Sequence, residues 1–148
     1  MLVPRALAIA VLGLVATSRP FAQSGLSKEL TSLQGTWVIT SVDGVKVPAG
    51  SPEVTLSIDG DKYSQTTDGT VVERGAIRLD PSRKPMVMDL FIAEGTDAHK
   101  AQFGVVQIEE GAIKFKLNAP GEPTRPTDFT PAPGYVVFVA RKKGMRVA

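Results

Sequence analysis

Few side chains in this sequence could do chemistry. His99 is the only histidine and the chain has no cysteine, so a hydrolase triad or a cysteine nucleophile lacks its parts. Asp97 stands two positions before His99 in the segment EGTDAHK. A zinc site takes three or four ligands, so this pair is too small for one. We expect His99 to be a solvated loop residue and the protein to hold no metal.

Carboxylates that could act as an acid and a base stand close together only beside turns. Asp59 and Asp61 surround one glycine, and Glu109-Glu110 precedes another. The chemistry of tight turns explains these carboxylates without catalysis. Pro120-Gly121 is followed by no helical pattern, so no helix end is predicted there to receive a phosphate. The sequence therefore predicts a protein that is not an enzyme and that holds no cofactor.

Asp89 lies between two apolar residues, Met88 and Leu90, in a segment with the pattern of a strand. If its side chain is buried, the carboxylate needs a partner, and Arg125 or Arg74 could provide one. The alternative is an exposed carboxylate on the outer face of a strand. In either case we interpret Arg125, which stands among prolines, as a loop anchor rather than a ligand clamp.

The N-terminal segment of the chain has the layout of a secretory signal peptide. Arg5 supplies the positive charge, Ala6 to Ala16 the apolar segment, and Ala22-Gln23-Ser24 a small-residue cleavage site. The apolar segment is shorter than a membrane span requires. We expect residues 1–24 to be a signal peptide and residues 25–148 to form one secreted or periplasmic domain; a short retained membrane anchor is the alternative.

Charge and cysteine content limit the expected partners. The chain has 17 basic and 15 acidic residues, and the two basic residues of the leader account for the difference. The end of the chain is basic, from Arg141 to Arg146. Such a tail could touch an anionic surface, but a solvated end is the simpler interpretation, and no nucleic-acid partner or membrane span is expected. Without disulfides, stability must come from the core.

The residues that could take part in chemistry must be positioned mainly by β-strands, because most of the domain alternates apolar and polar residues. Residues 24–33 predict one short helix with Ser27 as its cap. Eight strand-like runs follow, and several are joined by tight-turn signals such as Asp59-Gly60. We predict a single all-β domain, an antiparallel eight-stranded up-and-down barrel with a short N-terminal capping helix; a two-layer sandwich is the alternative.

Two of the predicted connections are long. One covers residues 43–52, and the other covers residues 118–134 and contains five of the eleven prolines of the chain. Each proline removes a backbone donor, so the second stretch cannot be a central strand. We expect a rigid loop or a lid that packs through Phe129.

The sequence LQGTW at residues 33–37 resembles the lipocalin pattern, in which a short helix precedes a Gly-x-Trp motif and an arginine ends the last strand. The matching residues are Gly35, Trp37 and Arg141. The resemblance implies a structural role for all three, with Trp37 at the closed end of the barrel under the helix and under Arg141. The chain resembles still more closely a family of small secreted lipocalin-like domains of planctomycete-type bacteria, which share the LQGTW start and a PG…RP..F loop, here residues 120–129. That family carries no established activity to transfer.

Lipocalins bind small apolar molecules in the barrel mouth, and the resemblance implies the same function here. The alternative is a barrel filled by its own side chains, which would act as a protein-interaction or structural module through its loops. An eight-stranded barrel permits both, since its interior can be filled or can hold one small ligand. The candidate ligand-lining residues are large and apolar or aromatic: Tyr63, Met86, Met88, Phe103 and Phe115.

Overall fold

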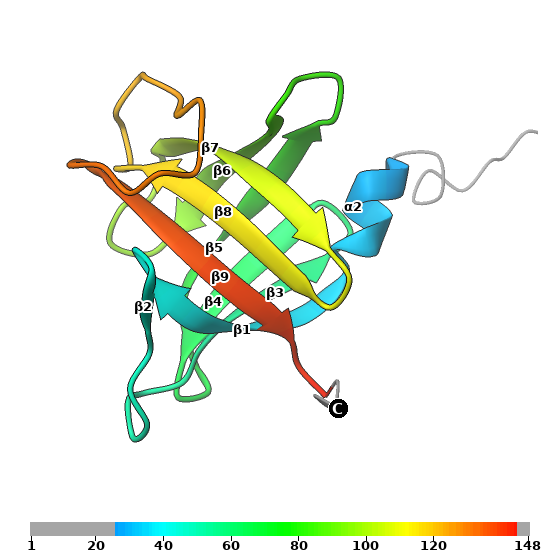
Figure 1. The fold of residues 1–148 in the computed structure, drawn as a ribbon. Coiled ribbons are helices and arrows are strands. Elements are labelled where there is room, and N and C mark those ends of the chain that lie inside the picture. The colour runs from blue at the N-terminus through cyan, green and yellow to red at the C-terminus, as the bar shows by residue number, and fades with distance from the viewer. Residues whose placement is uncertain (1–25, 145–148) are drawn as a thin grey trace, which may run out of the picture.

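A computed structural model describes residues 26–144 of the chain (Figure 1). The predicted signal peptide and the last residues of the basic tail lie outside the described residues. Within them the chain forms one short helix and nine strands. In chain order these are α2 (Lys28–Ser32), β1 (Gly35–Val42), β2 (Val45–Lys46), β3 (Val54–Asp59), β4 (Lys62–Thr67), β5 (Thr70–Asp80), β6 (Met86–Glu94), β7 (Ala101–Glu109), β8 (Ala112–Asn118) and β9 (Tyr135–Lys142).

Eight of these strands close into a barrel. Strands β1 and β3 to β9 each pair antiparallel with the next, and β9 returns to pair with β1. The remaining strand, β2, has two residues and pairs with the end of β1 inside the long connection 43–52, where no strand was predicted. The predicted eight-stranded barrel with an N-terminal helix is therefore confirmed, and the sandwich is excluded.

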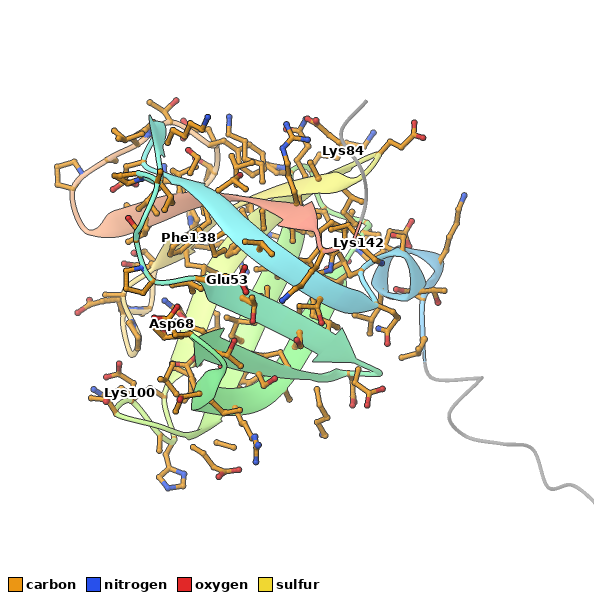
Figure 2. All side chains as sticks on the ribbon, turned by 90° about the horizontal axis from the view of Figure 1, so that it is seen from below. Glu53, Asp68, Lys84, Lys100, Phe138 and Lys142 are labelled. Atoms are coloured by element: carbon orange, nitrogen blue, oxygen red, sulfur yellow. The ribbon has the colours of Figure 1, made fainter. Side chains whose placement is uncertain are left out.

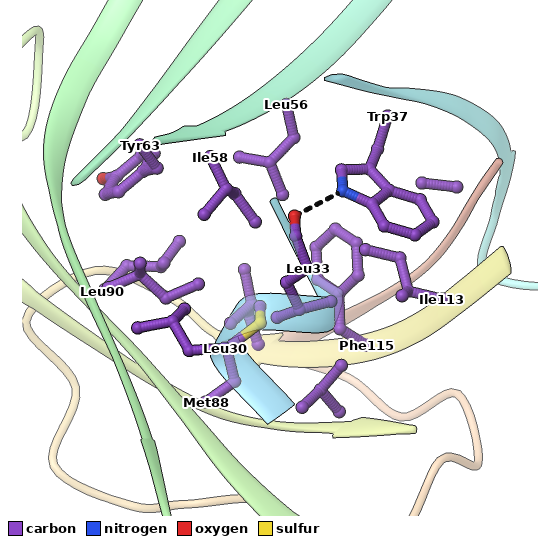
Figure 3. Packing of buried hydrophobic residues seen from close by; sticks show 14 residues of the cluster. Leu30, Leu33, Trp37, Leu56, Ile58, Tyr63, Met88, Leu90, Ile113 and Phe115 are labelled. Carbon is purple, nitrogen blue, oxygen red and sulfur yellow. Dashed lines mark hydrogen bonds between the residues drawn. The ribbon is translucent and has the colours of Figure 1, made fainter. Parts of the chain in front are cut away.

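The helix α2 covers one end of the barrel (Figure 3). The hydroxyl of Ser27 accepts a hydrogen bond from the backbone N–H of Leu30 at 3.0 Å, which confirms Ser27 as the N-cap. Leu30 and Leu33 are buried in the same apolar cluster as Trp37, and the indole N–H of Trp37 donates to the carbonyl of Leu33 at 2.8 Å. The prediction that Trp37 lies at the closed end beneath the helix is confirmed.

The residue that lies over the indole is Lys142, so the prediction that Arg141 covers Trp37 is wrong. In the pairing of β1 with β9, Lys142 stands opposite Trp37, whereas Arg141 stands opposite Val38. Since neighbouring residues of a strand point to opposite faces, Arg141 is directed outward and is exposed. The ammonium of Lys142 lies 5.0 Å from the centroid of the indole ring and donates to the carbonyl of Gln34.

Gly35 leaves room for this lysine. It has a φ of +113°, a value that favours glycine, and a Cβ atom there would lie 3.0 Å from the side chain of Lys142. The helix ends at Ser32 with Leu33 as its C-cap, so Gly35 is the first residue of β1 and does not cap the helix.

The proline-rich connection packs against the outer wall of the barrel, along β6 to β9. Val87, Val105, Lys116 and Val137 are cross-strand neighbours on this outer face, and all are buried. They are covered because the connection folds back over them, with Pro126 buried as well. The loop is thus fixed to the wall, and its first residues reach the barrel mouth.

Candidate functional site

The candidate site is a cavity of about 230 Å³ at the barrel end opposite α2. Figure 2 separates the two ends: Lys142 lies beside α2, and Asp68 and Lys100 lie in turns at the other end. The cavity is open to solvent there. Its lining combines apolar, aromatic and polar residues: Ile39, Val54, Thr55, Leu56, Tyr63, Gln65, Glu73, Leu90, Asp97, Gln102, Phe115, Leu117, Pro120 and Phe138.

One wall of the cavity is aromatic and belongs to β8 and β9. Phe115 and Phe138 face each other across these strands, with ring centroids 5.1 Å apart and planes inclined by 29°. Leu117 lies two residues further along β8 on the same face. This wall offers flat apolar surface to a ligand and no charge.

The opposite wall is polar and belongs to β4 and β5. Leu56, Gln65 and Glu73 are aligned across three neighbouring strands, so all three point into the barrel. The phenol of Tyr63, two residues before Gln65 on the same face of β4, donates a hydrogen bond to the carboxylate of Glu73 at 2.7 Å. Burial, this hydrogen bond and the nearby Glu73 charge raise the pKa of Tyr63 far above its ordinary value. Tyr63 is therefore a fixed donor.

Gly75 makes the position of Tyr63 possible. It stands opposite Tyr63 in the pairing of β4 with β5, and a Cβ atom there would lie 2.8 Å from the Tyr63 ring and 2.2 Å from the carbonyl oxygen of Phe91. A larger residue would displace the ring. The glycine inside the strand thus allows the phenol to reach Glu73.

The rim of the cavity is held by polar contacts of the loops. Asp97, from the β6–β7 connection, forms an ion pair with Lys100 at 3.1 Å. The side-chain amide of Gln102 donates to the carbonyl of Asn118 at 3.0 Å. This hydrogen bond links the start of β7 to the end of β8. His99 in the same connection as Asp97 is exposed and has a φ of +74°. Over residues 26–144, no group of three or more potential metal ligands is found.

Of the five predicted ligand-lining residues, Tyr63 and Phe115 line the cavity. Met88 is fully buried and packs in the apolar cluster (Figure 3), and Met86 packs against that cluster from its edge. Phe103 points outward, because it stands opposite the outward-facing Asp89, and its ring lies 5.2 Å from the guanidinium carbon of Arg125. The prediction that Phe103 lines the interior is wrong.

Sequence reasoning missed the polar residues of the cavity, above all Gln65, Glu73 and Gln102. Their strands carry polar residues on both faces, so alternation gives no sign of which face is inside. A bulge between Gln65 and Thr66 also shifts the pairing of β4 with β5. The glycine at position 75, opposite an aromatic residue, is the available signal for a close approach at this point.

Asp89 and Arg125 form a second polar site, on the outer face of the barrel. The carboxylate of Asp89 is 1% exposed and binds both terminal nitrogens of Arg125, with Nη2 to Oδ2 at 3.1 Å. Arg125 also donates to the carbonyl of Gly104 at 3.1 Å. The partner of Asp89 is therefore Arg125 rather than Arg74. These contacts anchor the proline-rich connection and lie outside the cavity.

A second contact of the same connection involves Lys116. Its ammonium donates to Asp128 at 3.1 Å and to the carbonyl of Thr130 at 2.6 Å. The hydrogen bond from Lys116, with one from the backbone N–H of Thr130, lowers the pKa of Asp128. The loop is thus held to the wall at two points.

Comparison with protein-family models, with curated proteins and with solved structures found no match to this chain. Over the described part of the chain, none of the helical segments has the length and apolar character of a membrane span.

Proposed function

We propose that this protein is a non-catalytic binding domain that holds one small, mainly apolar molecule in the mouth of its barrel. The observation that carries the proposal is the cavity of about 230 Å³, bounded by the Phe115 and Phe138 rings and by leucine side chains. Concave, mainly apolar sites with a few polar groups are the usual form of a small-molecule site. The resemblance to lipocalins and a secreted or periplasmic location belong to the same proposal.

The size of the cavity limits the ligand. Cavities of about 150 Å³ in other proteins hold a molecule such as benzene, whereas sites for drug-sized ligands measure about 300–1,000 Å³. The ligand of this barrel is therefore a molecule with one ring or a short chain, and not a long lipid. The apolar core below the cavity, around Met88 and Trp37, leaves no room for a deeper chain.

The proposal is tested by exposing the purified protein to a lipid and metabolite extract and identifying retained molecules by mass spectrometry. Val54 lines the cavity and is half-buried, so Val54→Phe adds a ring at its mouth. Val45→Phe makes the same change at an exposed position of β2. Wild type and Val45→Phe should retain the same small molecule, and Val54→Phe should lose it. Recovery of nothing, or of equal amounts by all three, would contradict the proposal and favour an interaction module.

A further inference from the structure

The polar side of the cavity carries charge of one sign. Two carboxylates, Glu73 and Asp97, belong to its lining, and among residues 26–144 no lysine or arginine does. Asp97 is already neutralised at the rim by Lys100, whose ammonium lies 3.1 Å from it. Glu73 is therefore the group that decides the charge preference of the cavity.

The carboxylate of Glu73 lacks a cationic partner within the described part of the chain. Its one side-chain hydrogen bond there comes from Tyr63, at 2.7 Å, and Tyr63 is a neutral donor. No ion pair within 4.0 Å of Glu73 is formed by the described residues. An ionised carboxylate at the wall of an apolar cavity is costly unless a positive group or further donors satisfy it.

The aromatic residues of the cavity suit the apolar body of such a ligand. Phe115 and Phe138 lie on the wall opposite Glu73 and stack on each other, with ring centroids 5.1 Å apart. Tyr63, whose hydroxyl donates to Glu73, lies on the same side as the carboxylate. The cavity thus combines an aromatic, apolar wall with a negative charge on the other side, within the volume of a one-ring ligand.

We infer that the ligand is a small organic amine in its protonated form, with the ammonium on Glu73 and a one-ring or short-chain apolar body against Phe115 and Phe138. This inference rests on the proposed function, since it names the class of molecule that the same cavity binds. A carboxylate ligand would meet the charge of Glu73 and be repelled. An alcohol could donate to Glu73 but would leave its charge without a counterion, so its bond would be weaker.

The inference is tested with three probes of matched size: benzylamine, benzyl alcohol and benzoate. Affinities are measured by calorimetric titration at pH 7 and low salt, and the site is located by NMR shifts of the cavity residues. Benzylamine should bind at least about tenfold more tightly than benzyl alcohol, as a charge-assisted hydrogen bond provides. Benzoate should bind more weakly than both. Equal binding of amine and alcohol, or tighter binding of benzoate, would overturn the inference while leaving the proposed function intact.

Two glutamine variants locate the charge preference. Glu73→Gln keeps the shape of the side chain and a hydrogen-bonding partner for Tyr63, so it should bind benzyl alcohol as wild type does and lose the preference for benzylamine. Glu94→Gln removes the same charge from an exposed position near the mouth, outside the cavity lining, and should keep that preference within about twofold. A preference that survives in Glu73→Gln would overturn the inference. If no probe binds wild type, the inference fails, and the extract experiment decides the proposed function separately.

Discussion

Arg125 and Asp89 stand 36 positions apart in the sequence and form an ion pair with two hydrogen bonds on the outer wall of the barrel. The pair joins the proline-rich connection to β6 of the barrel wall. Arg78 adds a second cation 3.6 Å from the same carboxylate, but its side chain is 63% exposed. Arg125 is therefore the main partner of a carboxylate that water does not reach.

Removal of Arg125 should destabilise the protein strongly. Arg125→Met keeps the apolar stem of the side chain but leaves Asp89 buried beside one exposed cation, and breaking a buried pair from one side costs about 3–5 kcal/mol. We expect chemical denaturation to show a loss of about 3 kcal/mol in the free energy of unfolding. Arg78→Met, the matched control, should cost less than about 1 kcal/mol.

The double variant Asp89→Leu/Arg125→Met separates loss of the pair from loss of packing. It removes both charges, so much of the stability lost in Arg125→Met should return. A double variant as unstable as the single one would show that the loop is held by other contacts.

The register between β1 and β9 makes a prediction about two neighbouring basic residues. Lys142 lies over the indole of Trp37, whereas Arg141 is exposed. Lys142→Met should lower the free energy of unfolding by about 1–2 kcal/mol, because it removes a cation from a ring face and a donor from the Gln34 carbonyl. Arg141→Met should change it by less than about 0.5 kcal/mol. The opposite order in denaturation experiments would contradict the observed register.

Trp37 itself should be the most costly single side chain to remove from the closed end. It is 2% exposed, packs under α2 and donates to the carbonyl of Leu33. Trp37→Ala should lower the free energy of unfolding by about 3–5 kcal/mol, as removal of a buried large aromatic residue does. Because the variant lacks the only tryptophan, unfolding is followed by circular dichroism. An unchanged midpoint would contradict the assignment of Trp37 to the closed end.

The sequence allowed the barrel to be predicted because several independent local signals agree. Tight-turn residues such as Asp59-Gly60 separate strands whose alternation has a period of two, and closure leaves no edge to protect. The helix cap at Ser27 and the buried Trp37 follow from equally local patterns. The exact register of β1 against β9 does not follow from local patterns, because a shift of one residue places Arg141 instead of Lys142 opposite Trp37. A bulge between Ile39 and Ser41 also lies near this pairing.

The site was harder to predict than the fold for a related reason. Strands β6 and β7 carry apolar residues on both faces, since the proline-rich connection buries part of their outer side, and Phe103 therefore has the pattern of an interior residue. The sequence alone does not determine whether Asp89 is exposed or paired, because only its tertiary contact with Arg125 decides this. When a loop distant in the sequence packs over the outer face of a strand, the periodicity of that strand does not reveal it.

The hydrogen bond between Tyr63 and Glu73 predicts how stability changes at alkaline pH. The folded protein raises the pKa of Tyr63, whereas the unfolded chain releases this proton near pH 10. Above that pH the unfolded state binds fewer protons than the native state, so the Tyr63 contribution to stability is complete below about pH 10 and is lost as the pH rises. The loss amounts to about 1.4 kcal/mol per pH unit. Tyr63→Phe lacks the titrating group, so the stability difference between wild type and variant should shrink by this slope between about pH 10 and 11.5. Denaturant unfolding at a series of pH values measures it, and parallel stability curves for the two proteins would show that Tyr63 ionises normally in the cavity.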